Sequence, residues 1–408
     1  MNTHHTIGID LGSNSLKMVI AESHPTEKKP TIIHTFETAS VGIRSGYVVD
    51  IAAASESLGK LIKRAEKEYS ENIRYAKFAI GGVGLMSQYV RTSSDDFKKD
   101  HEISQRDVED VIQKSEDLFS AKYPNKKILH IIPVKYRVDD RDVLGTPMGM
   151  YGSSLEVKVI FITIMEHHYD AFVSVIEKNN IGIDDIIAIP LADVAGSTSY
   201  TQKNQGVLVA NIGSETTSLA TFENGIITSL DILSIGSNDI TNDIALGLQI
   251  PLEEADSIKR NSSSDHPKRK IEEIVHARIA DILELITRHL IKIKKNRLLP
   301  AGIIYTGAGA KLLHLNEYTK EELKLPATTV SLKKISKKTK RTIDVPEQFS
   351  VAYGLCISEQ GRQLSQKKKL NFSNLKRTLN YWFNQIMPEH REFLLQSNAN
   401  LLEYTLYY

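Results

Sequence analysis

The sequence predicts an α/β fold made of two similar halves that face each other across a cleft. Two runs of short apolar strands, each turning at small polar residues, begin near Thr6 and again near Val207, about 200 residues further along the chain. Segments with apolar residues at helical spacing follow both runs. The chain has 408 residues, more than one hydrophobic core usually supports, so we expect more than one domain.

Strands and helices are expected to alternate in both halves, and the folded part is expected to end near Tyr353. Between about 85 and 163 the order strand, helix, strand, strand indicates a small α+β module set into the larger fold. We expect strands at 6–10, 16–21, 31–35, 76–81, 128–137, 156–162, 185–189, from 207, 218–223, 226–232 and 302–306. We expect helices at 50–69, 104–118, 166–179, 242–248, 252–259 and 271–293.

The composition excludes several classes of protein. Lys and Arg total 51 against 50 Asp and Glu, so the charge of the whole chain does not favour nucleic acid. The single cysteine, Cys356, excludes an internal disulfide framework and is expected to be a small buried apolar residue. The sequence contains neither a signal-peptide core nor a run of about 18 apolar residues, so we expect it neither to leave the cell nor to span a membrane.

The turn between the first two strands is a candidate phosphate site. Gly12 and the small polar residues Ser13, Asn14 and Ser15 leave backbone N–H groups open to phosphate oxygens. Asp10, at the strand end, is placed to hold Mg²⁺ through water, and Lys17 to neutralise phosphate charge. An ordinary hairpin turn whose Asp and Asn favour tight backbone geometry is the alternative.

Two further turns recur where a duplicated fold requires them. The second contains Asn211, Gly213, Ser214, Thr216 and Thr217, and would oppose the first turn across one triphosphate. The third, Gly307, Ala308 and Gly309, follows a strand, where bare backbone can approach a nucleoside. A plain strand–turn–helix corner explains the third turn equally well. The order and spacing of all three turns favour a nucleotide site.

Segments outside these turns resemble the FtsA family of the actin, Hsp70 and sugar kinase superfamily. The segments 128–133, 138–139, 147–152 and 155–159 look like subdomain 1C, which is specific to FtsA. The segments 234–245 and 252–259 are similar to those that line the FtsA nucleotide cleft. The match runs over 6–355, and implies an actin-like duplicated fold of two RNase H-like halves with an inserted 1C subdomain.

The resemblance also implies domain boundaries. Subdomain 1A would occupy 1–84 and 166–206, subdomain 1C 85–165, subdomain 2A 207–247 and 303–357, and subdomain 2B 248–302, with the end of 303–357 returning to 1A. A basic polar linker at 358–371, a membrane helix at 372–387 and an extension of unknown role at 388–408 would follow.

By resemblance, ATP or ADP with Mg²⁺ would lie between the halves, its phosphates held by the first two turns. Gly236, Asn238, Glu254 and Lys259 would join the third turn around the nucleoside. A solvated helix face is the alternative for Glu254 and Lys259. The family usually has Asp followed by glycines in the second turn, whereas this chain has Asn211, Ser214 and Glu215. Since an amide adds no negative charge at Mg²⁺, our hypothesis is a nucleotide-binding switch with little or no turnover.

The C-terminal segment 372–387 is predicted to form an amphipathic helix that lies in a membrane interface. Its membrane-facing and headgroup-facing residues are Phe372, Leu375, Lys376, Arg377, Leu379, Trp382, Phe383 and Ile386. A core helix docked on the folded body is the alternative. The polar linker before it, and the resemblance to FtsA, favour membrane attachment. The basic run 332–341 is expected to be a solvated loop or edge strand.

The resemblance implies a cell-division scaffold on the cytoplasmic face of the plasma membrane at the division site. It would form actin-like filaments by self-association, bind an anionic membrane surface, receive the C-terminal peptide of FtsZ on subdomain 2B, and contact later division proteins. Basic residues at the end of the long helix mark the candidate peptide site: Arg288, Lys292, Lys294, Lys295 and Arg297. One alternative is a PilM-like adaptor of type IV pilus assembly. The other is a metabolite kinase, although Asn211 argues against it.

Overall fold

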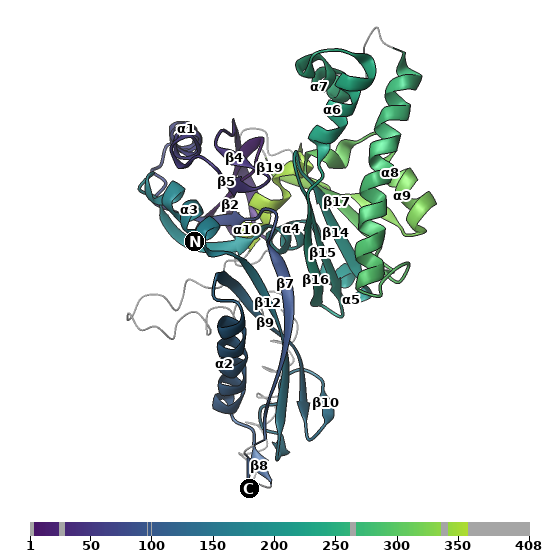
Figure 1. Cartoon of the computed structure of the whole chain (residues 1–408). Helices are drawn as coiled ribbons and strands as arrows, with labels where there is room; N and C mark the ends of the chain where they lie inside the picture. The colour runs from purple at the N-terminus through teal and green to yellow at the C-terminus, as the bar shows by residue number, and fades with distance from the viewer. Residues whose placement is uncertain are drawn as a thin grey trace. The chain divides into compact units, whose positions relative to one another are not determined.

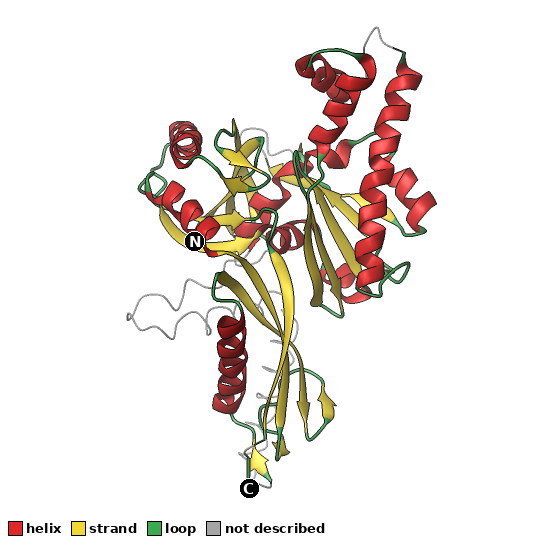
Figure 2. Cartoon of the chain, viewed as in Figure 1, coloured by secondary structure: helices red, strands yellow, loops and turns green. Residues whose placement is uncertain are grey.

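The computed structural model describes residues 4–23, 29–95, 97–98, 100–261, 267–335 and 342–357 (Figures 1 and 2). The linker, the expected membrane helix at 372–387 and the C-terminal extension lie outside these residues, as do 336–341 of the basic run. The chain forms two compact units. The main unit comprises Met1–Ser87 and Thr163–Ile357, and the inserted unit comprises Gln88–Ile162.

The first sheet of the main unit has seven strands in the order β13-β6-β1-β2-β3-β19-β20. Strands β1, β2 and β3 form an antiparallel meander, while β6 runs parallel to both β1 and β13. The strands are β1 (His4–Leu11), β2 (Ser15–Ser23), β3 (Thr31–Ala39), β6 (Tyr75–Ile80), β13 (Gly182–Ala188), β19 (Leu332–Ile335) and β20 (Thr342–Val345). Helices α1 (Ile51–Tyr69) and α3 (Glu166–Glu177) pack on each other and on this sheet. A short hairpin, β4 (Ile43–Arg44) and β5 (Tyr47–Val48), precedes α1.

The second sheet of the main unit has five strands in the order β16-β15-β14-β17-β18. They are β14 (Val207–Ile212), β15 (Thr217–Glu223), β16 (Ile226–Leu233), β17 (Ile303–Thr306) and β18 (Ala327–Thr329). Helices α8 (Lys268–Lys292) and α9 (Leu315–Leu323) cover it, and Figure 1 shows α8 running along the strands. Ile282, Ile286 and Leu290 of α8 join Leu208 and Tyr305 of the sheet in one buried cluster. Helices α5 (Tyr200–Gln205), α6 (Ser237–Leu248) and α7 (Leu252–Asn261) complete this half.

The two sheets repeat the same topology. The order β13-β6-β1-β2-β3 of the first sheet recurs as β18-β17-β14-β15-β16 in the second, with the same parallel and antiparallel pairings. Asp10 lies opposite Lys17 in the first sheet, and Asn211 lies opposite Ser218 at the equivalent place in the second. The predicted duplicated α/β fold is therefore confirmed.

Local sequence signals set the starts of α1 and α6. The Asp50 carboxylate accepts hydrogen bonds from the N–H groups of Ala52 and Ala53, so Asp50 caps α1 instead of belonging to it. Helix α6 begins at Ser237, five residues before the predicted start, because the Asp239 carboxylate accepts a bond of 2.8 Å from Gly236 N. The basic run 332–341 contributes β19, which pairs with β20 and β3.

Helical structure continues past the end expected near Tyr353 to Ile357, the last residue of the expected segment 303–357. Helix α10 spans Ser350–Ile357, with Leu355 and Cys356 fully buried. The predictions also missed α4, which spans Ile189–Ser197. Cys356 is buried, as predicted.

Helices α4 and α10 join the two halves by backbone contact. Helix α10 packs against β1, β2 and β6 of the first sheet, and α4 against β14, β15 and β17 of the second. A Cβ atom at Gly354 would lie 1.7 Å from the Ala192 carbonyl oxygen, and one at Gly196 would lie 2.2 Å from the Ser350 carbonyl oxygen. Only glycine lets the two helices come this close.

We expect Gly354→Ala to destabilise the main unit by about 1–3 kcal/mol or more, because the new methyl group meets rigid backbone in a packed interior. Chemical denaturation measures the free energy of unfolding. Gly247→Ala is the matched control, since its methyl group meets only the tip of the Ile274 side chain. A loss of stability in the control equal to that in Gly354→Ala would contradict the proposed backbone contact.

The inserted unit is an α+β module with its own core. Its four-stranded sheet has the order β10-β9-β12-β7, made of β7 (Met86–Ser94), β9 (Lys126–Val138), β10 (Arg141–Val143) and β12 (Leu155–Met165). Strands β8 (His101–Glu102) and β11 (Tyr151–Gly152) form a separate pair. Helix α2 (Gln105–Lys122) packs Val111, Ile112 and Phe119 against Val157 and Phe161 of β12. Ser104 and Asp107 cap it reciprocally, so Ser104 precedes the helix instead of belonging to it.

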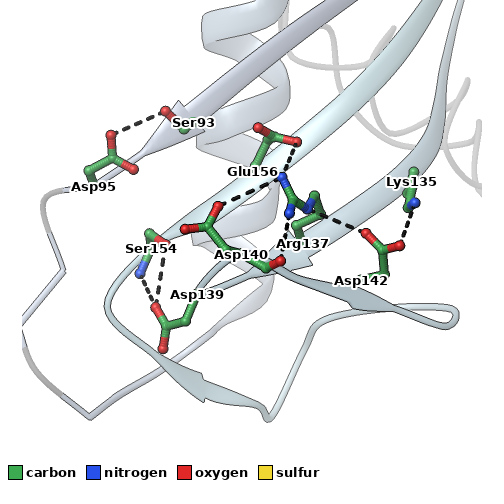
Figure 3. A network of polar contacts seen from close by, with 9 residues as sticks. All are labelled: Ser93, Asp95, Lys135, Arg137, Asp139, Asp140, Asp142, Ser154 and Glu156. Atoms are coloured by element: carbon green, nitrogen blue, oxygen red, sulfur yellow. Dashed lines mark hydrogen bonds and ion pairs between the residues drawn. The ribbon is translucent and has the colours of Figure 1, made fainter.

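A polar network fixes the β9–β10 hairpin of the inserted unit (Figure 3). Arg137 lies between Asp140, Asp142 and Glu156, at 3.7, 3.3 and 3.8 Å. The Asp139 carboxylate accepts hydrogen bonds from the backbone N–H groups of Ser153 and Ser154, and the first of these lowers its pKa. These bonds hold the turn in its left-handed geometry.

No helix within the described ranges is long and apolar enough to cross a membrane.

Candidate functional site

A cavity of about 1270 Å³ lies within the main unit, between the two sheets' turns. Ligand sites typically measure about 300–1,000 Å³, so a nucleotide fits this volume. All three predicted turns line it. The predicted residues that line the cavity are Asp10, Gly12, Ser13, Asn14, Ser15, Lys17, Asn211, Gly213, Ser214, Thr216, Asn238, Lys259, Gly307, Ala308 and Gly309.

The first turn brings a buried carboxylate and a lysine to the cavity wall. Asp10 is 7% exposed, and its Oδ1 atom has no hydrogen-bond partner among the described residues. Burial raises the pKa of Asp10, and the nearby Lys17 ammonium opposes that rise. The Ser15 hydroxyl donates to Glu37 at 2.6 Å, and Lys17 Nζ donates to the Ser15 carbonyl oxygen at 3.3 Å. An unsatisfied buried oxygen beside a cation is suited to a ligand or metal-bound water.

The second turn is tied to the start of α6. Gly213 N donates to the Thr216 carbonyl oxygen at 2.9 Å, which closes the turn. The N–H groups of Ser237 and Asn238 donate to the carbonyl oxygens of Gly213 and Ser214, both at 2.8 Å. These bonds hold the turn against the start of α6.

The third turn lies directly over the second. Gly307 has φ of +77°, and a Cβ atom there would lie 2.5 Å from Asn211 Oδ1 and 2.6 Å from the Ile212 carbonyl oxygen. Only glycine can take this conformation at this distance. The strand end at Asn211 and the third turn thus form one surface.

Three predicted residues do not line the cavity. The buried Thr217 hydroxyl donates to the Ile235 carbonyl oxygen at 2.8 Å, and Gly236 lies against the backbone of Ser214. Glu254 is exposed on α7. Lys259 does line the cavity, and its ammonium donates to the Ser237 carbonyl oxygen and to Thr241 Oγ1 at 3.1 and 2.6 Å, which ties α7 to α6.

The sequence reasoning missed a buried carboxylate behind the second turn. Asp193 of α4 is 1% exposed and accepts hydrogen bonds from the Ser350 hydroxyl of α10 and from Thr306 Oγ1 of β17. Burial raises its pKa to about 6, while hydrogen bonds from Ser350, Thr306 and Asn211 lower it and the Asp10 charge raises it. Asp193 therefore connects α10, which packs on the first sheet, with β17 and Asn211 of the second sheet. Nothing local in the sequence marks it, because α4 is short and mostly apolar.

The raised pKa of Asp193 predicts a pH-dependent loss of stability. The folded state holds this proton more tightly than the unfolded state, whose value is near 3.8, so stability falls as pH rises between about 4 and 6. The difference corresponds to about 3 kcal/mol at neutral pH. Denaturation midpoints from pH 4 to 7 should show this component in the native chain and not in Asp193→Asn.

Asp142→Asn is a control that should alter the pH dependence of stability in the opposite direction. The reason is that a hydrogen bond from Lys135 lowers the pKa of the exposed Asp142 carboxyl. Parallel pH profiles of the native chain and Asp193→Asn would contradict the role of Asp193.

Comparison with known families identifies both units. The family model for the SHS2 domain inserted in FtsA matches residues 87–163, and the model for cell division protein FtsA matches residues 208–361. The chain belongs to the FtsA family. The FtsA of Bacillus subtilis strain 168 is 27% identical over 335 residues, covering 76% of this chain and 75% of that protein. The FtsA of Borreliella burgdorferi is 24% identical over 401 residues, covering 92% and 96%.

Two solved structures with a similar fold are less similar in sequence to this chain than these FtsA relatives are. The PilM–PilN type IV pilus biogenesis complex matches with a TM-score of 0.64 at 15% identity, covering 86% of this chain and 97% of that one. MreB5 of Spiroplasma citri bound to ADP matches with a TM-score of 0.50 at 13% identity, covering 87% and 96%. Together with the SHS2 match, these likenesses confirm the actin-like fold with an inserted subdomain.

Proposed function

We propose that this FtsA-family chain is a cell-division scaffold that binds ATP or ADP with Mg²⁺ and tethers FtsZ to the membrane as an actin-like filament. The cavity is the observation that supports nucleotide binding. Two equivalent turns with open backbone face it from opposite halves, and beside them lie Lys17 and the partnerless oxygen of Asp10. A neighbour of the same fold, MreB5, has been solved with ADP bound.

The residues of this chain fit the groups of a magnesium nucleotide. The backbone of Gly12 to Ser15 would bind phosphate oxygens, and Lys17 would neutralise part of their charge. Mg²⁺, when bound, supplies charge neutralisation of the phosphates, and the Asp10 carboxylate is the group placed to hold it through water. Lys259 and the third turn would border the nucleoside.

The chain's second turn supports binding with little or no hydrolysis. Asn211 stands where the first half has Asp10, and Ser218 stands where it has Lys17. The second half therefore offers neither a carboxylate nor a cation at the equivalent positions. An amide cannot act as a general base toward an attacking water.

Membrane attachment is proposed from the sequence of 372–387 alone. Burial of its large apolar side chains, each contributing at most about 1.5–3 kcal/mol, would give one chain reversible attachment. A filament that carries many such helices would stay bound, since every further attachment is intramolecular.

The proposed FtsZ peptide site on subdomain 2B is the basic end of α8. Two of its expected cations already have acidic partners: Arg288 binds Glu284 at 2.6 Å, and Lys295 binds Glu223. Lys292, Lys294 and Arg297 would provide the charge for the peptide.

A pilus-assembly adaptor is the second candidate, because the PilM–PilN complex shares the fold with a TM-score of 0.64. The FtsA family matches over both units favour cell division. Binding of FtsZ, or of a pilus-protein peptide in its place, would separate the two functions.

We expect Lys17→Ala to weaken the binding of Mg·ADP by about tenfold or more, because a charge-assisted bond contributes about 1.5–3 kcal/mol. Isothermal titration calorimetry measures the dissociation constant. Lys60→Ala, which removes an exposed cation of α1 paired with Glu56, is the control and should bind like the native chain. Binding unaffected by Lys17→Ala would contradict the assigned phosphate site.

We expect the full chain, and not a version ending at Asn371, to sediment with vesicles that contain anionic lipid. The full chain should also carry FtsZ into the pellet. The difference in sedimentation between anionic vesicles and vesicles of neutral lipid measures the electrostatic part of the attachment. Equal sedimentation of both versions would contradict the membrane role of 372–387.

A further inference from the structure

Glu215 of the second turn reaches across the cleft to the first half. Ser45 N, in the turn between β4 and β5, donates to Glu215 Oε2 at 2.5 Å. Arg44 Nη1 lies 3.9 Å from Glu215 Oε1. The Glu215 side chain is 23% exposed and lines the cavity together with Arg44 and Ser45.

The same β4–β5 turn is bound to the first phosphate turn. Gly46 N donates to Ser13 Oγ at 3.0 Å. Ser45 and Gly46 both have positive φ, at 48° and 78°, as expected for the two central residues of a tight hairpin turn between β4 and β5. The turn is supported from behind, because Val83 N donates to the Ser45 carbonyl oxygen and Gly82 packs on Gly46.

These contacts form a continuous link between the two phosphate turns. It runs from Ser13 through Gly46 and Ser45 to Glu215. A backbone N–H group and a guanidinium beside a phosphate cleft are suited to the terminal phosphate of a nucleotide. In this chain the Glu215 carboxylate already accepts the hydrogen bond of Ser45 N and lies 3.9 Å from Arg44 Nη1.

We propose that Glu215 is a specificity-determining residue whose carboxylate occupies the terminal-phosphate subsite, so the cleft takes a nucleoside diphosphate in preference to a triphosphate. The inference rests on the proposed nucleotide site. A γ-phosphate would meet a carboxylate of like charge and would compete with it for Ser45 N and Arg44. A diphosphate ends before this subsite and leaves the link between the halves intact.

Calorimetric titration of the full chain with Mg·ADP and Mg·ATP tests the proposal. The native chain should bind Mg·ADP at least about tenfold more tightly than Mg·ATP. Glu215→Gln keeps an oxygen for Ser45 N and removes the charge, so it should bring the two affinities within about threefold of each other, mainly by tightening Mg·ATP binding. Glu215→Ala removes the whole group and should give the same loss of preference.

Glu56→Gln is the matched control, since Glu56 is an exposed carboxylate on α1 that does not line the cavity. It should keep the native preference, and thermal melting of each variant reports its folding. Equal affinity of the native chain for both nucleotides, or a preference unchanged in Glu215→Gln, overturns the role of Glu215 and leaves nucleotide binding standing. Binding of neither nucleotide by the native chain overturns the proposed function and this inference together.

Discussion

The backbone contact between α4 and α10 is the constraint on which the rest of the main unit depends. Helix α10 packs on the first sheet, α4 packs on both sheets, and Gly196 and Gly354 let the backbones of the two helices touch. Asp193 lies at this crossing and binds Ser350 of α10 and Thr306 of β17, which leads into the third turn. The geometry of the cleft therefore follows from one tightly packed crossing. The buried carboxylate costs stability at neutral pH, a cost that its hydrogen bonds offset only in part.

The two halves share a topology and differ in charge. The first turn has Asp10 and Lys17, whereas the second has Asn211 and Ser218 at the same places and Glu215 at its tip. Charged groups that could hold a metal nucleotide are thus concentrated on one side. The acidic group of the other side accepts a hydrogen bond from a backbone N–H of the first half. This asymmetry is consistent with a site that holds a nucleotide and does little chemistry on it.

The family assignment extends across both units, although each has a separate core. The inserted unit forms its own buried cluster around α2 and β12, and its hairpin is fixed by ion pairs around Arg137. It matches the SHS2 domain inserted in FtsA. The inserted unit and residues 208–361 of the main unit thus each match an FtsA family model.

The sequence by itself determined the duplicated α/β fold and the three turns, because strand alternation, glycine-rich turns and helix caps are local signals. It did not reveal α4 and α10, since short helices that are apolar on all sides lack helical periodicity. Tertiary structure alone decided the roles of Asp193 and Glu215. Asp193 is 157 residues from Ser350, and Glu215 is 170 residues from Ser45, so neither contact leaves a local pattern. Whether a carboxylate is buried, or bridges a cleft, depends on which distant elements the fold brings together.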